Sequence, residues 1–315
     1  MTKFYKTLKD YNPSLTSESS IAEGGREAMR RAFIQLLAHE AGGDKGNDIE
    51  DIHQMRVATR RIRTLFDLLS AYYKRSVVAD YEKYLKKLAD RLGNVRDLDV
   101  QIRDLQNYLD EQKIDNSESK RILQALGERR RKTHRKLTKF LRDKNYKKFR
   151  RTFSQFLQSQ GKGEKSLDPM QAYQIRHVLP VIIQQHLAAV RAFDALINQD
   201  NPPFHELRIE CKQLRYVLEA FEDMLGSTAG GFLDELKQMQ DQLGAMQDVD
   251  VATALFDDVF DLAKSDKLGN ETLQDYLAYR AKGQQQLEAE FDDLWKEFTS
   301  RKVQQRLAEA LLVLR

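Results

Sequence analysis

The chain carries one pattern of basic residues twice, about 150 positions apart, and this repeat constrains the fold more than any other feature. In residues 53–63 a histidine is followed by arginines three, seven and ten positions later, which is helical spacing. The apolar residues of that stretch fall on the opposite side of the same helix. The spacing returns in residues 205–215. We therefore predict two related helical units that pack against each other.

Further cations recur at offsets of 150 or 151 residues. The cations kept in both halves are His53 and His205, Arg56 and Arg208, Arg60 and Lys212, Arg63 and Arg215, Lys86 and Lys237, Arg26 and Arg176, and Arg129 and Arg280. A face that only confers solubility would have drifted with the local composition, and the second half is acidic. The retained cations therefore predict matching basic faces around a shared surface.

The charge of the two halves differs strongly. Residues 1–157 contain 35 Lys and Arg against 22 Asp and Glu, a net charge of +13, whereas residues 158–315 contain 17 against 26, a net charge of −9. Within residues 120–151 there are 15 Lys and Arg and two acids. This asymmetry indicates an anionic partner for the first half.

Composition favours an all-α fold, because charged residues make up 32% of the chain and prolines number only 5. The single cysteine, Cys211, excludes a disulfide within the chain and fits a cytoplasmic location. No apolar run approaches the roughly 18 residues of a membrane span, and no signal peptide is recognisable at the N-terminus. We therefore expect no membrane partner.

Four segments follow from the pattern. Residues 1–18 are predicted to be an irregular lead-in, residues 19–157 the first helical-bundle repeat, residues 158–169 a Gly-, Ser-, Lys- and Pro-containing linker, and residues 170–315 the second repeat.

Helix boundaries in the first repeat follow from periodicity and capping residues. Helices are expected over 21–40, 48–73, 77–92, 118–144 and 146–157, with a loop over 41–47. Asp48 should cap its helix. Gly93 should end the third helix, and Asp97 or Asp99 should cap a next helix that runs to about residue 109.

The second repeat is predicted to follow the same order. Asn201 should cap the helix that contains residues 204–216. A later helix should end at Gly244, with Asp248 and Asp250 beyond it. The last long helices should cover about 270–298 and 303–314.

At these residues the chain resembles a known family, the CHAD domain, or conserved histidine α-helical domain. The matching segments are the His-x2-Arg-Val-Ala-Thr-Arg-Arg-x-Arg stretch from His53, the Leu-Gly-x2-Arg-Asp-Leu-Asp-Val block from Leu92, and the His-x-Leu-Arg-x3-Lys-x-Leu-Arg-Tyr stretch from His205. The resemblance covers about residues 19–300. It implies two pseudo-symmetric four-helix bundles that together form one domain. It also implies non-enzymatic binding of inorganic polyphosphate on a basic surface shared by the bundles, as a stand-alone member of the family.

The residues suit such a ligand. Polyphosphate is a linear polyanion without bases to read, so its receptor needs many cations at near-regular spacing. Along a helix, the observed spacing places cations roughly every 5 Å. The histidines lie in the first turns of their helices, where backbone N–H groups also favour anions, and binding should strengthen below about pH 6.5 as they become charged. The 14 retained cations form the predicted polyphosphate-binding set. Gln247 stands where Arg96 does in the first half, which leaves Arg96 outside it.

Other interpretations stay open. His53 and His205 could bind a metal, but neither has a second His or Cys one turn away. The aspartates beyond Gly93 and Gly244 could serve a metal-dependent phosphohydrolase, or could cap helices and pair with basic side chains. The basic run could bind a nucleic-acid backbone, although aromatics for base stacking are sparse. The acidic half could instead contact the basic half of a neighbouring molecule. We predict no catalytic residue, no metal and no cofactor, and partners that are polyphosphate, its granules or polyphosphate-metabolising proteins.

Overall fold

The structure is a computed structural model that describes the backbone of residues 3–166, 168, 170–199, 202–264 and 271–314. Side chains are described for the same residues except 3–4 and 247–264. The all-α fold is confirmed: the described residues form helices and two isolated bridges, with no strand among them. No helix in the described part of the chain has the length and apolar character that crossing a bilayer requires.

The order of the long helices is the same in both halves. The first half contains α1 (Lys3–Asp10), α2 (Ile21–Lys45), α3 (Ile49–Leu68), η1 (Ser70–Tyr72), α4 (Arg75–Glu111), α5 (Ser117–Arg142) and α6 (Lys144–Leu157). The second half contains α7 (Ile175–Arg191), η2 (Ala192–Ala195), α8 (Phe204–Ala220), η3 (Glu222–Met224), α9 (Ala229–Lys264), α10 (Glu271–Thr299) and α11 (Arg301–Leu312).

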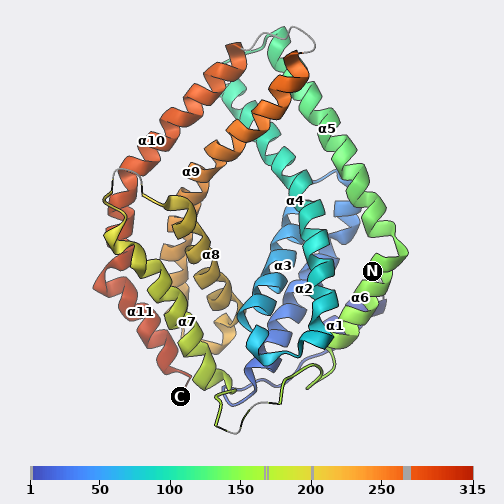
Figure 1. Cartoon of the computed structure of the whole chain (residues 1–315), viewed down its shortest axis with the longest axis vertical. Coiled ribbons are helices and arrows are strands. Elements are labelled where there is room, and N and C mark those ends of the chain that lie inside the picture. The colour runs from blue at the N-terminus through green and yellow to red at the C-terminus, as the bar shows by residue number, and fades with distance from the viewer. Residues whose placement is uncertain (1–2, 167, 169, 200–201, 265–270, 315) are drawn as a thin grey trace.

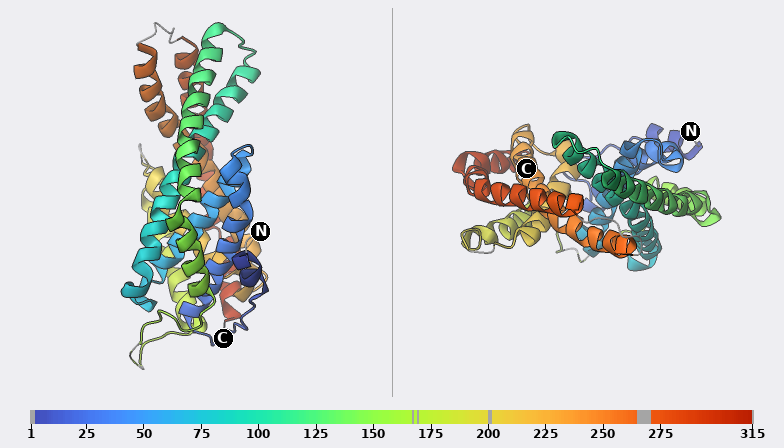
Figure 2. Two further views of the ribbon diagram at one scale, coloured as in Figure 1. Left: turned by 90° about the vertical axis from the view of Figure 1, so that its right-hand side faces the viewer. Right: turned by 90° about the horizontal axis from the view of Figure 1, so that it is seen from above.

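The two halves form the two arms of an elongated molecule (Figure 1). α3 and α8 approach each other in the lower part of the view and diverge toward the upper tip. At that tip the α4–α5 pair meets the α9–α10 pair, and the views in Figure 2 show the same two pairs there. The arms therefore meet at two places, with α3, α4, α8 and α9 nearest the molecular centre.

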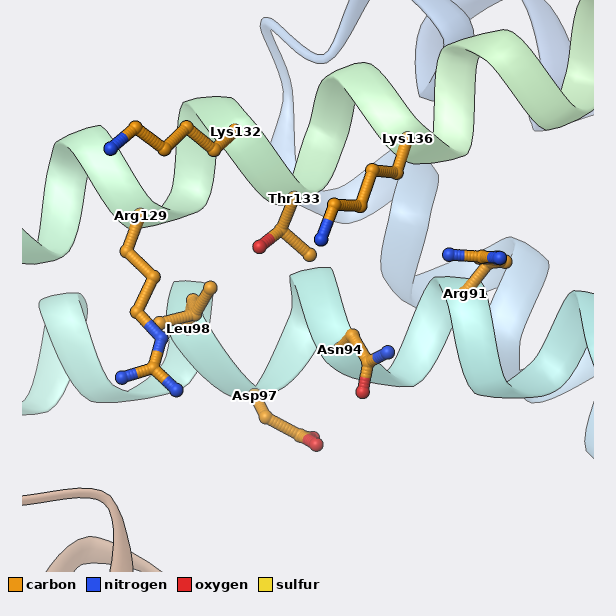
Figure 3. A pocket seen from close by; sticks show the side chains of 8 residues that line it. All are labelled: Arg91, Asn94, Asp97, Leu98, Arg129, Lys132, Thr133 and Lys136. Carbon is orange, nitrogen blue, oxygen red and sulfur yellow. The ribbon is translucent and has the colours of Figure 1, made fainter. Parts of the chain in front are cut away.

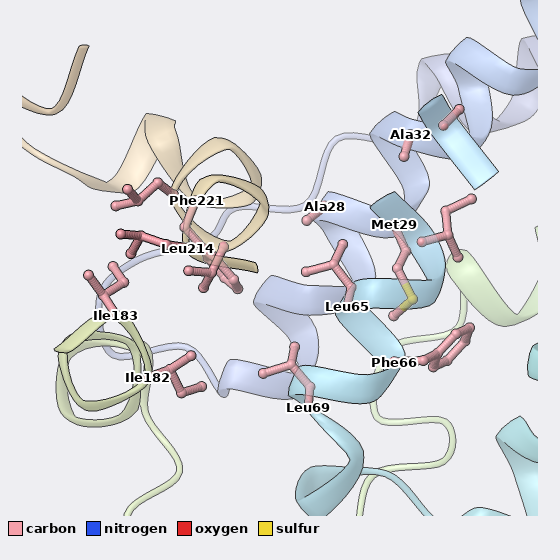
Figure 4. Packing of buried hydrophobic residues seen from close by; sticks show 14 of the residues in the cluster. Ala28, Met29, Ala32, Leu65, Phe66, Leu69, Ile182, Ile183, Leu214 and Phe221 are labelled. Atoms are coloured by element: carbon pink, nitrogen blue, oxygen red, sulfur yellow. The ribbon is translucent and has the colours of Figure 1, made fainter. Parts of the chain in front are cut away.

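The lower meeting place is part of one apolar core. Buried residues from α2 and α3, such as Met29 and Phe66, belong to the same cluster as Leu214 of α8 and Phe221. Figure 4 shows side chains of both arms converging there. Burying apolar surface between the arms stabilises their relative position by roughly 25 cal/mol per Å². The two repeats are thus held together by a shared core.

The upper meeting place is a smaller cluster. Tyr108 of α4 packs edge-on against Tyr276 of α10, with ring centroids 5.2 Å apart. Asn116, at the start of α5, donates a hydrogen bond to the Thr272 hydroxyl at 3.2 Å. These contacts fix the distance between the arms at the tip.

The linker between the repeats is tied to the first arm by Arg26. Its guanidinium is 1% exposed and donates hydrogen bonds to the backbone oxygens of Phe156, Ser159 and Lys162. It also lies 3.4 Å from a Glu23 carboxylate oxygen. Arg26 therefore organises the chain crossing from one arm to the other.

Two predictions near the N-terminus are wrong. The lead-in contains a helix, α1, whose Leu8 side chain is buried and whose Leu8 carbonyl accepts a hydrogen bond from Arg30. The predicted loop over 41–47 is mostly the last turns of α2, which ends at Lys45 and is capped by Gly46 with φ 72°. Its glycines let α3 approach: a Cβ at Gly42 would overlap the Asp51 carboxylate, and one at Gly43 would lie 2.5 Å from the Met55 sulfur.

The predicted helix end at Gly93 is also wrong. α4 continues through this glycine, and Asp97 and Asp99 lie inside the helix rather than at a cap. The apolar series that includes Leu92 and Val95 continues to pack in the core. This packing outweighs the roughly 1 kcal/mol that a glycine costs in a helix interior. α9 continues through Gly244 in the same way.

The remaining helix predictions are largely confirmed. Asp48 caps α3 by accepting a hydrogen bond from the Glu50 N–H at 2.8 Å, and α5, α6, α10 and α11 lie close to their predicted ranges. α3 ends at Leu68 and a short 3-10 turn follows. The predicted cap at Asn201 and the side chains of Asp248 and Asp250 lie outside the described residues.

Candidate functional site

The two repeated basic stripes lie on α3 and α8, the helices through which the two arms approach each other at the lower meeting place. Each helix buries its apolar side, so its basic stripe is turned away from the apolar core. Ile62 of α3 and Leu214 of α8, for example, are both fully buried. Between the arms, Arg60 of α3 and Arg215 of α8 lie over one ring, that of Tyr216, at 4.9 and 5.6 Å from its centroid.

Five cations from the two stripes act on one another at this place. We call them the central cationic surface, and they are Arg56, Arg60, Arg208, Lys212 and Arg215. Burial lowers the pKa of Lys212 from the ordinary value of 10.5, and the other four side chains lower it further, to about 7. Burial likewise lowers the pKa of Arg60, and Arg56, Arg215 and Arg208 add to the shift. The two halves therefore contribute jointly to one positive region.

Few carboxylates of the described residues pair with Arg56, Arg60, Lys212 or Arg215. Arg60 and Lys212 form no ion pair with any described residue. Arg56 lies 3.9 Å from an Asp97 oxygen, and Arg215 lies 3.5 Å from Glu219. The described part of this surface therefore carries an excess of positive charge.

Tyr216 is the centre of packing for the surface. It is 4% exposed, and its ring receives the Arg60 and Arg215 guanidinium groups. Its hydroxyl has no hydrogen-bond partner among the described residues. Cation–π contacts of this kind hold planar guanidinium groups in place without neutralising them. The ring therefore orients the arginines and leaves their charge available.

His53 borders the surface at the N-terminal end of α3. Burial lowers its pKa from 6.5, Arg96 of α4 lowers it further, and Arg56 and Arg60 contribute less. Arg96 is therefore a member of this region that comparison of the two halves missed, because its counterpart is Gln247. In the sequence, Arg96 could have been identified from its position directly before Asp97, in the segment from Leu92 that resembles the family. His205 is exposed in the first turn of α8.

Ion pairs between the arms flank the surface. Arg61 of α3 reaches Glu219 of α8 at 2.8 Å, and Glu219 also pairs with Arg215 one helical turn away. Arg31 of α2 pairs with Asp223. Glu219 therefore lies where it can orient Arg215, whereas the corresponding residues of α3, Arg63 and Asp67, form no ion pair with each other. Arg61, which lacks a repeated partner, serves to join the arms.

The other cations of the predicted polyphosphate-binding set do not lie together at the central cationic surface. Arg63 is half-buried on α3, and Lys86 and Lys237 are exposed on α4 and α9. Arg176 is bound at the start of α7, 3.3 Å from Glu18. Because Arg26 and Arg176 already have partners in the fold, we leave both out of the proposed surface.

Arg129 and Arg280 have unlike surroundings. Arg129 lines a groove between α4 and α5, whereas Arg280 of α10 pairs with Asp104 of α4 at 3.2 Å.

The aspartates that follow Gly93 and the Cys211 thiol contact other side chains or are buried in the fold. Asp99 is 4% exposed and pairs with Arg130 at 2.7 Å. Burial raises the pKa of Asp97, an effect that Arg56 and Arg96 oppose. Burial also raises the pKa of Cys211, so the adjacent Lys212 does not activate this thiol. Within the described residues, no group of three His, Cys, Asp or Glu side chains could hold a metal ion.

Comparisons with known proteins place this arrangement in a family. The sequence model of the CHAD domain matches residues 27–257. The crystal structure of the CHAD domain from the plant Ricinus communis is similar, with a TM-score of 0.73, 21% identity, and coverage of 92% of this chain and 95% of that one. PptA from Streptomyces chartreusis is also similar in fold, with a TM-score of 0.62, 14% identity, and coverage of 88% and 99%. A search among curated protein sequences gives no match. The chain belongs to the CHAD domain family.

Proposed function

We propose that the protein binds inorganic polyphosphate, without catalysis, on the central cationic surface and the adjacent His53. The observation that carries this proposal is the meeting of like charges from both arms around Lys212, whose pKa falls to about 7. A polyanion would reverse that shift, because its charge would stabilise the protonated amine.

The chemistry of the surface suits a phosphate chain. Guanidinium groups can offer paired N–H donors to phosphate oxygens, and Arg60 and Arg215 are already oriented by Tyr216. The ring itself is 4% exposed and covered by these groups, so it offers little surface on which a base could stack. These features favour a ligand made of phosphates over single-stranded nucleic acid.

The test is a titration of the protein with long-chain polyphosphate and with single-stranded RNA of equal total charge, at several salt concentrations. We expect tighter binding of polyphosphate and a steep loss of affinity with salt. Equal or tighter binding of RNA would contradict the proposal. Incubation of polyphosphate with the protein and Mg²⁺ or Mn²⁺ should release no phosphate in proportion to protein, and such release would favour a phosphohydrolase instead.

We extend the proposal to location. A cytoplasmic protein with this surface should associate with polyphosphate granules or with proteins that metabolise polyphosphate. Co-sedimentation with isolated granules should be lost when polyphosphate is digested beforehand. Retention after digestion would point to a protein partner.

A further inference from the structure

A second concentration of cations lies outside the central cationic surface, in the groove between α4 and α5. The groove encloses about 450 Å³, and its lining includes Arg91, Asn94 and Asp97 of α4 together with Arg129, Lys132 and Lys136 of α5. Figure 3 shows these side chains projecting from the two neighbouring helices. The basic run over 120–151 thus places part of its charge in a defined concave site.

The groove has an excess of positive charge. Four cations line it against one carboxylate, Asp97, which leaves a net charge of +3. Arg91, Lys132 and Lys136 are exposed and form no ion pair with any described residue. A site of this volume with unbalanced cations on two facing helices is suited to phosphate groups.

The groove is continuous with the central cationic surface across α4. Asp97 lines the groove and also lies 3.9 Å from Arg56. The Arg56 side chain lies beside Gly93 of α4, where an added Cβ would be 3.8 Å from the arginine Nε. Around the α4 helix, position 93 lies beside Arg56, and positions 97 and 94 lie successively farther round toward the α4–α5 groove. Because Gly93 has no side chain, it places no obstacle on the α4 surface between Arg56 and the groove.

The corresponding positions of the second half lack the excess charge. At an offset of 151 residues, Arg91, Lys132 and Lys136 become Gln242, Gly283 and Leu287. Gly283 and Leu287 line a different hollow, of about 810 Å³, which lies between α10 and α4 of the first arm. Its lining includes three cations and two acids, a net charge of +1, and two of these cations, Arg103 and Arg280, lie 3.5 and 3.2 Å from Asp104. The excess of exposed positive charge is therefore confined to the α4–α5 groove of the first arm.

We propose that the α4–α5 groove is a second phosphate-binding subsite, reached from the central cationic surface across α4 at Gly93. A long chain would leave the centre toward the first arm, where Arg91, Lys132 and Lys136 hold its next phosphates. This inference rests on the proposed function. It concerns the path of a long ligand, and a short one is held by the central surface alone.

The test uses the variant R91Q/K132Q/K136Q with two probes, long-chain polyphosphate and tripolyphosphate. We expect the affinity for the long chain to fall roughly tenfold or more, since each exposed charge pair contributes up to about a factor of five. The salt dependence of long-chain binding should become shallower, and the affinity for tripolyphosphate should stay unchanged. The matched control is R135Q/K144Q/K147Q, which removes the same charge from exposed positions outside the groove lining.

The outcomes separate the two proposals. If the groove variant binds the long chain as tightly as the unmodified protein, or no more weakly than the control variant, the subsite is contradicted while polyphosphate binding stands. If tripolyphosphate binding falls as much as long-chain binding, the groove is a separate site for small phosphate compounds, and the proposed path is wrong. If the unmodified protein binds neither probe, the proposed function itself fails.

Discussion

The helix pairs α4–α5 and α9–α10 differ in charge in a way that α3 and α8 do not. α3 and α8 carry matching cations that meet at Tyr216, whereas three of the four cations of the α4–α5 groove correspond to Gln242, Gly283 and Leu287 in the other arm. The recurring cations of α3 and α8 lie where the halves meet, together with the unrepeated Arg61. The unrepeated cations Arg91, Lys132 and Lys136 line a groove of the first arm alone. The comparison therefore separates a surface that both arms build from a groove that one arm charges.

The largest expected effect comes from removing the cations that both arms contribute. The variant R56Q/R60Q/R208Q/K212Q should lower polyphosphate affinity by roughly a hundredfold or more, because hydrogen bonds to charged groups contribute about 1.5–3 kcal/mol each. Fluorescence anisotropy with labelled polyphosphate measures the loss, and circular dichroism checks the helical content.

Its control removes four exposed cations away from the centre, in the variant R121Q/R135Q/R301Q/K302Q. Full affinity in the first variant, or an equal loss in both, would show that overall charge rather than the shared surface decides binding.

A pH effect should follow from Lys212. Its pKa of about 7 in the free protein means that the amine is charged below pH 7 with or without ligand. Above pH 7 the free amine loses its proton, and binding must take up a proton again. Affinity should therefore fall by up to about tenfold per pH unit above pH 7.

The variant K212R, which keeps its charge, should show a flat affinity profile between pH 7 and 9. An identical slope in both proteins would assign the proton to another group. Because burial and Arg96 lower the pKa of His53, its own contribution should lie below the pH 6.5 expected for a free histidine.

A smaller gain should follow from giving α9 and α10 the charges that α4 and α5 carry at the corresponding positions. In the variant Q242R/G283K the new side chains lie beside α9 and α10, and a Cβ at Gly283 has no neighbour within 4 Å. We expect long-chain affinity to rise roughly two- to fivefold per cation, with tripolyphosphate unaffected. The same substitutions in the R91Q/K132Q/K136Q background should partly restore binding. A folded variant without any gain would show that this side of α9 and α10 lies off the path of the ligand.

The smallest expected effect is on stability. A Cβ at Gly93 would contact only the Arg56 Nε at 3.8 Å, and one at Gly244 would contact nothing within 4 Å. G93A and G244A should each therefore raise the free energy of unfolding by about 1 kcal/mol, since alanine is the better helix former. In G42A, by contrast, the new methyl group would overlap the Asp51 carboxylate, so this variant should be less stable. Urea denaturation measures all three. A loss of stability in G93A or G244A would indicate a packing role for those glycines.

Much of this arrangement could be predicted because it is periodic. Helical spacing predicts which side of α3 is basic and which is apolar, and the offset between the halves identifies α8 as its partner. Contacts between residues far apart in the sequence leave no comparable periodic pattern. Arg26 recurs as Arg176, yet its guanidinium binds linker carbonyls, which the sequence does not reveal.

The sequence around Gly93 predicts a helix end because glycine has a low helix propensity. The buried contacts of neighbouring residues, which keep α4 helical through this position, cannot be read from local propensity. The basic run over 120–151 was visible, but which of its cations face α4 depends on how α5 packs.

The central claim is that α3 and α8 form one binding surface for one chain. Calorimetric titration of a polyphosphate of defined length into the unmodified protein and into R56Q/R60Q tests it most directly. We predict one bound chain per protein in both cases, with a large loss of affinity in the variant. Two chains per unmodified protein, reduced to one in the variant at full affinity, would show two independent sites and contradict the account.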